Sequence, residues 1–372
     1  MPHANSRNKI EQLLSFADIE IDGNNPWDPQ IHNDKFYSRL LAEGSLGLGE
    51  SYMDGWWDCN SLDKFFHRIL QAELDTKVKL RTMLFDILKS NLTNLQKPSR
   101  AFHVGHKHYD IGNDLYQRML DKRLIYSCGY WKNASSLDDA QENKLDLVCR
   151  KLDLHPGMRV LDIGCGWGGT ARFAAERYKV EVVGITISEK QVQFGNELCR
   201  GLPVEIRMQD YRTLKGTFDR ILSIGMFEHV GYKNYITFFR VINRCLKDNG
   251  LFLLHTIGSN HSVTSTDPWI ERYIFPNSML PSAKQICAGI EGLFVLEDWH
   301  SFGGDYDTTL MQWFRNFDKS WDVIKKKYGE RFYRMWKYYL LSCAGSFRAR
   351  KNQLWQIVLS ANGVSGGYKS LR

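Results

Sequence analysis

Apolar residues in the second half of the chain follow two alternating patterns. Short, nearly continuous apolar runs, such as those at 160–163 and 180–186, are typical of buried strands. Between them, apolar positions recur every three or four residues, which is typical of helices that cover a sheet. This alternation predicts a doubly wound, mostly parallel α/β sheet. The predicted strands are 160–163, 180–186, 204–208, 219–224, 251–256, 294–300 and 354–359, and the predicted helices are 135–152, 170–178, 189–199, 235–246, 308–321 and 331–350.

The first 95 residues show mainly the helical pattern. Helices are predicted at 8–17, 35–43 and 62–95, and the alternation at 19–23 favours a short strand. A polar stretch with a proline, Gln96–Arg100, interrupts the pattern. We therefore predict a small helical domain at 1–95, a linker at 96–108 and a catalytic domain at 109–372. Within the last, the aromatic-rich insertion 258–293 is long enough for a substrate lid.

A glycine-rich turn follows the strand predicted at 160–163. Its glycines, Gly164, Gly166 and Gly169, allow a sharp turn and leave room for a ligand against the backbone. The same spacing also fits a dinucleotide fingerprint, so the glycines alone do not choose between cofactors. Asp162, however, lies where a carboxylate can meet the amino group of S-adenosylmethionine. The next strand ends at Thr186 rather than in the acid expected for a dinucleotide ribose, so the pattern favours S-adenosylmethionine.

Composition narrows the class of protein. The chain has 372 residues, of which 43% are hydrophobic and 13% aromatic, enough for a large core and an apolar pocket. A net charge of +7 suits an anionic membrane surface and nucleic acid equally well. No apolar run approaches the roughly 20 residues that span a bilayer, so any membrane contact is expected to be peripheral.

Cysteines and histidines give no sign of a metal site. The eight cysteines have neither zinc-like nor disulfide-like spacing, and residues 1–22 do not read as a signal peptide, which together favour a reduced, cytoplasmic compartment. His103, His106 and His108 lie close together, but no cysteine or acid stands at zinc-ligand spacing beside them. We therefore predict no bound metal.

Several stretches together resemble one family, the bacterial cyclopropane fatty acid synthases. These stretches are 44–58, 126–131 (Tyr-Ser-Cys-Gly-Tyr-Trp), 161–169, 225–231, 253–258 and 305–309 (Asp-Tyr-Asp-Thr-Thr). The resemblance covers nearly the whole chain. It implies the fold of a class I S-adenosylmethionine-dependent methyltransferase, a Rossmann-like doubly wound sheet, with a small helical N-terminal domain. It also implies a homodimer that acts peripherally on a phospholipid bilayer, at the cytoplasmic face, without nucleic acid. We expect residues 1–95, together with the basic helices near Lys325 and Arg348, to make the membrane contact.

The resemblance implies a methylene transfer from S-adenosylmethionine to the cis double bond of a phospholipid acyl chain. The alkene attacks the activated methyl group, a carbocation forms, a base removes a proton, and the ring closes. A cation in an apolar pocket is stabilised by aromatic faces and a nearby negative charge, and water must be excluded. In this family the base is a bound bicarbonate, whose matching ligands here are Cys128, Glu228, His255, the backbone at Ile257, and Tyr306.

The resemblance also assigns the cofactor contacts. Asp162, Gly164 and Gly166 match the positions that hold the methionine end, and Tyr126 and Ser127 those that close over it. The remaining matches are Thr186 and Gln191 for the ribose, and Gln209, Asp210 and Tyr211 for the adenine. From the residues alone, Gln191 could equally be an exposed helical side chain and Tyr211 a core aromatic.

Three other functions stay open at this point. One is methyl transfer to another lipid or to a small-molecule nitrogen or oxygen nucleophile, which would give a methylated product without a ring. Another is dinucleotide-dependent oxidation, which would show as NADH binding. The third is lipid binding without catalysis, which the intact cofactor and base positions disfavour.

Overall fold

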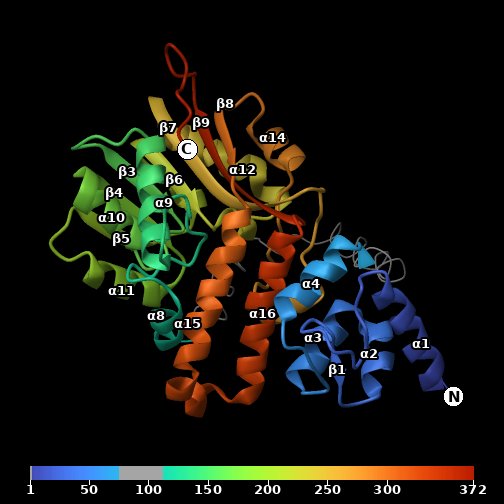
Figure 1. Cartoon of the computed structure of the whole chain (residues 1–372). Coiled ribbons are helices and arrows are strands. Elements are labelled where there is room, and N and C mark those ends of the chain that lie inside the picture. The colour runs from blue at the N-terminus through green and yellow to red at the C-terminus, as the bar shows by residue number, and fades with distance from the viewer. Residues whose placement is uncertain (1, 75–111) are drawn as a thin grey trace. The chain divides into compact units, whose positions relative to one another are not determined.

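The structure is a computed structural model that describes residues 2–74 and 112–372 (Figure 1). Two compact units share these residues: a helical unit (2–74, 265–276 and 306–352) and a sheet unit (112–264, 277–305 and 353–372). The predicted helix beyond residue 74, the predicted linker 96–108 and the three neighbouring histidines lie outside the described residues.

The sheet unit is built on a seven-stranded sheet with the order β5-β4-β3-β6-β7-β9-β8. Its first five strands pair in parallel, and β8 pairs with β9 in antiparallel fashion. The strands are β3 (Arg159–Ile163), β4 (Glu181–Thr186), β5 (Val204–Met208), β6 (Phe218–Ile224), β7 (Leu246–Ser259), β8 (Val295–Ser301) and β9 (Asn352–Ser360). All seven predicted strands are present. β7 begins earlier and ends later than predicted, and at its carboxyl end the apolar run continues into Ile257 and Gly258.

Helices cover both faces of this sheet. The helices of the sheet unit are α8 (Asn113–Met119), α9 (Leu137–Lys151), α10 (Gly169–Tyr178), α11 (Glu189–Leu198), α12 (Tyr235–Cys245) and α14 (Ala283–Ile290), with short 3-10 turns η3 (Tyr211–Thr213), η4 (Phe227–His229) and η5 (Tyr232–Asn234). Serines begin three of them: Ser136, Ser188 and Ser282 each accept a hydrogen bond from an amide in the first turn. These caps satisfy amides that have no partner within the helix.

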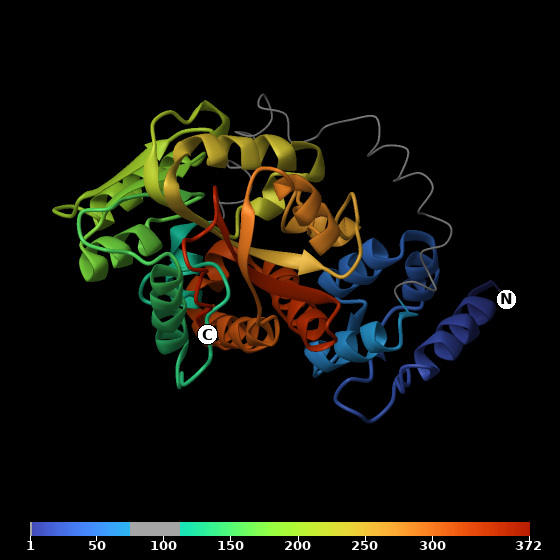
Figure 2. The same ribbon diagram turned by 90° about the horizontal axis from the view of Figure 1, so that it is seen from above.

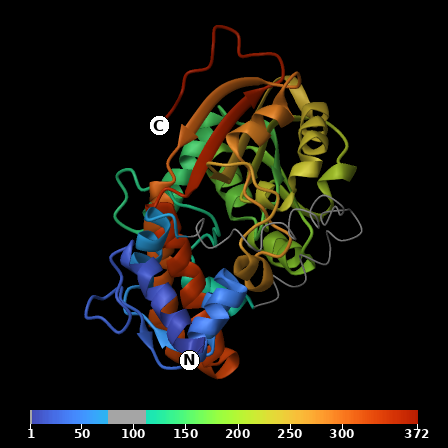
Figure 3. The ribbon, with the colours of Figure 1, turned by 90° about the vertical axis from the view of Figure 1, so that its right-hand side faces the viewer.

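Side chains alternate between the two faces along each strand. Leu161 and Ile163 of β3 pack in one apolar cluster with α12 and α14, whereas Val160 packs in a second cluster with α9 and α10. Likewise, Phe252 of β7 faces the first cluster and Leu253 the second. Strands buried on both faces read as continuous apolar runs, which is why they were predictable. Figure 3 shows the green helix α9 on one side of β8 and β9, and the yellow helix α12 on the other.

The helical unit joins segments that are distant in sequence. It contains α1 (Pro2–Ser15), α2 (Lys35–Glu43), α3 (Ser45–Met53), α4 (Leu62–Gln71), α13 (Pro268–Tyr273), most of α15 (Gly304–Tyr328), α16 (Glu330–Arg348) and the short antiparallel pair β1 (Gln30–Ile31) and β2 (Trp57–Asp58). Helices α15 and α16 lie side by side (Figure 1), and α16 packs on α3 and α4. A Cβ at Gly345 of α16 would lie 2.6 Å from the carbonyl oxygen of Asp63, so this glycine permits the close approach of α16 and α4.

Three sequence predictions differ from the structure. Residues 265–276 and 306–352 pack with the helical unit, although the whole range 109–372 was predicted as one catalytic domain. The predicted strand at 19–23 is wrong: the Asp28 carboxylate accepts hydrogen bonds from the amides of Glu20 and Asn25 and holds a loop there.

The insertion 258–293, predicted as a lid, is not one exposed loop. Trp269 of α13 is buried against α3, where a Cβ at Gly49 would lie 2.3 Å from its ring. Ile286 of α14 is fully buried in the core of the sheet unit, and α14 begins with a capping box between Ser282 and Gln285. Both helices are thus parts of packed cores.

Candidate active site

The glycine turn after β3 has the backbone geometry of a ligand cradle. Gly164, Gly166 and Gly168 have φ values of +82°, +56° and +81°, which residues with a Cβ rarely adopt. The amides of Gly164 and Cys165 donate to the carbonyl of Ile185 on β4, which fixes the turn to the sheet. A Cβ at Gly166 would meet no protein atom within 4 Å, so the space beside this residue is open.

Asp162, just before this turn, is buried and carries an unsatisfied oxygen. The side chain is 2% exposed, and Oδ2 has no hydrogen-bond partner among the described residues. Burial raises the pKa of Asp162 to about 7, and the positive charge of Lys144 opposes this rise. A buried carboxylate without a donor is suited to a cationic ligand group such as the amino group of a bound amino acid.

Lys144 on α9 was not predicted, yet its charge reaches several of the predicted residues. Its side chain is fully buried, and Nζ donates to Ser127 Oγ at 3.0 Å. Burial lowers its pKa to about 8, while the nearby carboxylates of Asp121 and Asp162 oppose this change. The Lys144 charge also lowers the pKa of His255, after the larger effect of burial. Lys144 therefore links the predicted cofactor and base residues electrostatically.

Ser127 and Tyr126 lie near this lysine and the glycine turn. Gln141 Nε2 donates to the backbone oxygen of Ser127 at 2.8 Å, so α9 holds this residue by two contacts. Tyr126 packs edge-on against Tyr116 of α8, which in turn packs against Trp167 of the glycine turn. The predicted closing residues thus contact both α9 and an aromatic row that ends at the turn.

Thr186 and Gln191 are in direct contact at the end of β4. Thr186 Oγ1 donates to Gln191 Oε1 at 2.6 Å, and both side chains are buried. Gln191 is therefore not an exposed helical residue. The contact leaves the amide nitrogen of Gln191 as a donor, which suits a hydroxyl group of a ribose.

The three residues predicted for the adenine differ in their surroundings. Gln209 donates to Thr213 at the end of β5, and Asp210 caps the 3-10 turn η3 by accepting from the Arg212 amide at 2.9 Å. Tyr211 packs edge-on against Phe238 of α12 in the apolar core. The sequence left a core role open for Tyr211, and its ring has that role here.

Glu228 and His255 form the second polar group of the sheet unit. Glu228 follows β6, and its Oε1 accepts from the Ile257 amide of β7 at 2.6 Å. His255 lies two residues earlier on β7, and its Nδ1 accepts from Gln356 Nε2 of β9 at 3.3 Å. The remaining atoms, Glu228 Oε2 and His255 Nε2, are buried with no hydrogen-bond partner in the described ranges.

Burial sets the protonation states of this pair. It raises the pKa of Glu228 to about 7, and it is the largest cause of a His255 pKa far below the usual range. His255 is therefore neutral, and because Nδ1 accepts, its hydrogen is on Nε2. Buried polar atoms are normally paired, so Glu228 Oε2 and His255 Nε2 are each candidates for a ligand contact.

Three of the five predicted anion ligands need comment. The Ile257 amide was predicted to donate to the anion, but it donates to Glu228 instead, because the carboxylate lies directly opposite. Tyr306 is buried in the helical unit, where its ring stacks on Phe347 at 4.5 Å. Cys128 is fully buried in the sheet unit, and its thiol opposes the fall in the pKa of Lys144.

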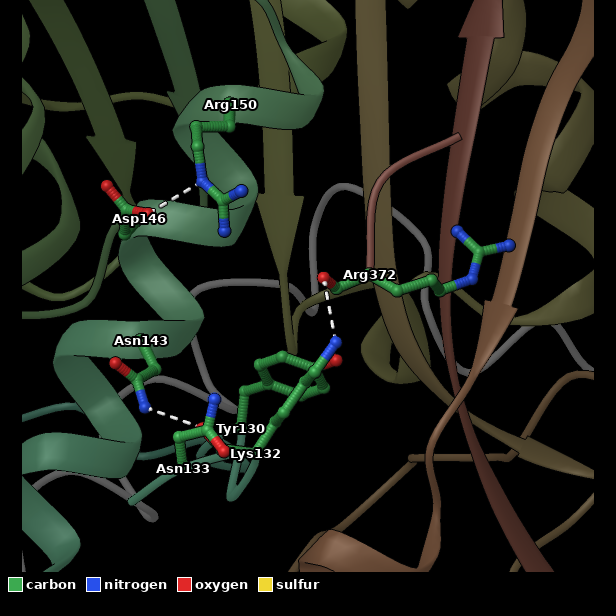
Figure 4. Close-up of a pocket in the computed structure, with 7 residues that line it drawn as sticks. All are labelled: Tyr130, Lys132, Asn133, Asn143, Asp146, Arg150 and Arg372. Carbon is green, nitrogen blue, oxygen red and sulfur yellow. Dashed lines mark hydrogen bonds and ion pairs between the residues drawn. The ribbon is translucent and has the colours of Figure 1, made fainter. Parts of the chain in front are cut away.

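A polar cavity of about 270 Å³ lies elsewhere in the sheet unit (Figure 4). It contains none of the predicted site residues. Its lining residues are Tyr130, Lys132, Asn133, Asn143, Asp146, Arg150 and Arg372. Arg150 is paired with Asp146 at 2.7 Å, and Lys132 Nζ donates to the carbonyl of Arg372.

Comparison with known proteins identifies the family. The family model described as mycolic acid cyclopropane synthetase matches residues 96–357. The chain belongs to the mycolic acid cyclopropane synthetase family. It is 54% identical to the cyclopropane-fatty-acyl-phospholipid synthase of Escherichia coli (strain K12) over 373 residues, which covers 100% of this chain and 97% of that protein. It is also 38% identical to a probable fatty acid methyltransferase of Pseudomonas putida, covering 68% of this chain and 67% of that protein.

Solved structures of this family have the same fold. The mycolic acid cyclopropane synthase CmaA1, solved in complex with SAH and CTAB, is 31% identical and superposes with a TM-score of 0.65, covering 69% of this chain and 97% of that one. The predicted family, fold class and enzyme class, an S-adenosylmethionine-dependent transferase, are thus confirmed. Among the described residues, no cluster suited to a metal ion and no helix long and apolar enough to cross a membrane occurs.

Proposed function

We propose that this chain acts as a cyclopropane-fatty-acyl-phospholipid synthase, with S-adenosylmethionine as the methylene donor and bicarbonate as the base. Identity to the Escherichia coli enzyme along the whole chain supports the reaction. The observation that carries the chemistry is the pair of buried atoms without partners, Glu228 Oε2 and His255 Nε2. Buried polar atoms are normally paired, so an unpaired set indicates a ligand site.

Asp162 and the glycine turn hold the cofactor in this proposal. The unpaired Asp162 oxygen would accept a hydrogen bond from the amino group of S-adenosylmethionine. The open space at Gly166 would admit the methionine part of the cofactor. When bound, S-adenosylmethionine supplies an activated methyl group to the alkene. The charge of Lys144 favours the ionised form of Asp162, and its ammonium group donates to Ser127.

Glu228 and His255 bind the base. Neutral His255 donates from Nε2, and Glu228 can donate or accept at Oε2, because its pKa is near neutrality. Bicarbonate, when bound there, supplies an acceptor for the proton released as the cyclopropane ring closes. The Ile257 amide orients Glu228 rather than binding the ion, and Cys128 is proposed as a further ligand by its sequence match. Tyr306 stays a prediction from the sequence match alone.

We also propose that the chain is a homodimer that docks peripherally on a phospholipid bilayer, at its cytoplasmic face. The net charge of +7 and the exposed Lys325 on α15, which also pairs with the exposed Asp322 at 2.7 Å, suit an anionic surface. Arg348, which the sequence also suggested for this contact, is instead paired with Asp63 and Asp307 inside the helical unit. Vesicle sedimentation at rising salt concentration, and light scattering of the active protein, test these two proposals.

Mass spectrometry and NMR of phospholipid acyl chains test the reaction itself. Vesicles with unsaturated chains are incubated with the protein and S-adenosylmethionine. The expected product gains one CH2 unit and loses its olefinic protons. A methylated chain that keeps a double bond would instead favour the activity named for the Pseudomonas putida relative.

Carbonate-free buffer tests the base separately. Activity is expected to fall after degassing and to return with added bicarbonate, most clearly in Glu228→Gln, whose site binds the ion more weakly. Full activity of that variant without carbonate, and no response to bicarbonate, would overturn the proposed base.

A further inference from the structure

A short segment of the sheet unit, Tyr368–Arg372, is fastened to β8 by a bidentate ion pair. Arg372 Nη1 and Nη2 donate to the two carboxylate oxygens of Asp298, each at 2.7 Å, and Ser370 Oγ donates to Oδ1 at 2.9 Å. Tyr368 donates from its hydroxyl to the carbonyl of Lys151 at 2.9 Å, and the segment lies beside α9 (Figure 2). Bidentate arginine–carboxylate pairs are strong and fix geometry. We call these five residues the latch.

One residue of the latch, Arg372, lines the cavity of Figure 4, but its guanidinium group does not point into that cavity. In that view the guanidinium of Arg372 points away from Arg150 and Asp146. Its partner Asp298 is only 6% exposed, whereas the Arg372 side chain is 41% exposed, so the pair lies at the surface over a buried carboxylate. The role of Arg372 therefore lies in its contact with Asp298 rather than in the cavity.

The Asp298 carboxylate that binds Arg372 also forms an ion pair with a buried lysine, Lys151. Lys151 is fully buried on α9, and its Nζ lies 3.3 Å from Asp298 Oδ2 and 3.1 Å from His300 Nδ1. Because an ammonium group only donates, His300 accepts at Nδ1. Burial lowers the pKa of Lys151 to about 8, and the Asp298 charge opposes this change. The latch thus holds in place the carboxylate that keeps Lys151 charged.

His300 lies next to the proposed base site. On β8 and β9, His300 is the direct register partner of Gln356, the residue that donates to His255 Nδ1. Directly opposite residues of an antiparallel pair point to the same face of a sheet. The ring of Phe302 packs on His300 at 4.8 Å and edge-on against His255 at 5.9 Å. Polar and aromatic contacts therefore connect the latch to the ring of His255.

We propose that the latch is a positioning element for His255, acting through Asp298, Lys151 and His300. This inference rests on the proposed function of His255 as an anion ligand. When the latch is removed, Asp298 loses its bidentate partner, and it no longer holds the ammonium group of Lys151 against His300. Gln356 and Phe302 then lose the neighbours that fix them, so Nε2 of His255 no longer points steadily at the anion.

The cofactor end of the site does not depend on this chain of contacts. Asp162 belongs to β3, and the amides of Gly164 and Cys165 fix the glycine turn to Ile185 of β4. Loss of the latch is therefore expected to lower turnover while leaving S-adenosylhomocysteine binding intact.

The test compares Arg372→Ala, Arg372→Lys and Lys369→Ala in the full chain. Arg372→Ala is expected to lower kcat by roughly ten- to a hundredfold, since small displacements of catalytic groups cost about that much. Arg372→Lys keeps the positive charge but loses the bidentate geometry, so its kcat is expected to lie between those of the wild type and Arg372→Ala. Lys369→Ala removes a positive charge from an exposed position of the same segment and should leave kcat unchanged. Calorimetry with S-adenosylhomocysteine should give the wild-type affinity for all three.

Nitrogen-15 NMR of the histidine side chains adds a readout that does not depend on turnover. His255 is assigned with His255→Gln, and its signals are expected to show one neutral tautomer in the wild type and Lys369→Ala, and a mixture in Arg372→Ala. Wild-type kcat with an unchanged His255 signal in Arg372→Ala would overturn the inference. A parallel loss of cofactor affinity would also overturn it, by showing general unfolding. If wild-type protein makes no cyclopropane while the His255 signal still responds to Arg372→Ala, the proposed function fails and the latch contact stands.

Discussion

Two buried carboxyl groups, Asp162 and Glu228, lie at the carboxyl ends of neighbouring parallel strands, and burial raises the pKa of each to about 7. Their partners differ. Asp162 lies near a positive charge, that of Lys144, whereas Glu228 accepts from a neutral amide, that of Ile257. Each also has one unpaired oxygen. Although the two side chains are similarly buried, Asp162 is suited to a cationic ligand group, and Glu228 is suited to a ligand with which it can share a proton.

The largest expected effect distinguishes these two roles. Glu228→Gln should lower kcat by about 10²–10⁴-fold, because a group that holds the base acts mainly after methyl transfer begins. S-adenosylhomocysteine affinity, measured by calorimetry, should stay at the wild-type value. A matching loss of affinity would show that Glu228 serves the cofactor instead.

Asp162→Asn should give the opposite result. Removing the charge that meets the cofactor's amino group is expected to weaken S-adenosylhomocysteine binding about a hundredfold, the range measured for buried charge pairs. Asparagine keeps the shape, so the thermal midpoint of unfolding should change little. Unchanged affinity in this variant would end the assignment of Asp162 to the cofactor.

Gly166→Ala should reduce affinity about tenfold, because the new Cβ would enter the open space of the cradle. Gly201→Ala is the matched control. Gly201 also has a positive φ, and its Cβ would also meet no atom within 4 Å, so the backbone strain is comparable. Equal affinity of the two variants for S-adenosylhomocysteine would show that the space at Gly166 is not used by the ligand.

The pH dependence of cofactor binding should reveal the Asp162–Lys144 pair. Because binding needs ionised Asp162, S-adenosylhomocysteine affinity should fall as pH drops below about 7, by up to about tenfold per pH unit. The Lys144 charge lowers the pKa of Asp162, so Lys144→Met should move this fall to higher pH. A midpoint that does not move would separate Lys144 from the cofactor site.

The smallest effect concerns stability. The pKa of Glu228 is raised from 4.5 to about 7, so the stability it contributes is present below pH 4.5 and is lost as pH rises through 7. Glu228→Gln cannot ionise, so its free energy of unfolding should fall less than that of the wild type across this interval. The difference is expected to be on the order of 1–3 kcal/mol in urea titrations. Parallel pH profiles would show that Glu228 is solvated.

The parts of the site that follow local pattern could be predicted, and those set by long-range contacts could not. Asp162 and its glycines lie within one strand–turn unit, so their roles were readable from ten residues. Lys144 was missed because a lysine on an amphipathic helix usually faces solvent, and only the tertiary structure buries it. The one available signal was its position seven residues before Lys151 on the apolar side of the helix.

The fold shows the same limit. The strands of the sheet were predictable because they are apolar on both faces. The helical period of α16 predicts a helix but not its partner, so its packing with α4 in the helical unit could not be foreseen. The engagement of the Ile257 amide by Glu228 likewise depends on the spacing of β6 and β7 rather than on either segment alone.

The seven-residue interval between Lys144 and Lys151 on α9 fixes the distance and direction between their two ammonium groups. Seven residues are two turns, about 10.5 Å, and they keep both ammonium groups on the buried side of one helix. One inserted residue between them would rotate Lys151 by about 100° and carry it away from Asp298 and His300. The number of residues between the two lysines is therefore constrained in the same way as the identity of each lysine. Evolutionary or engineered change in this part of α9 is expected to occur by substitution rather than by insertion or deletion.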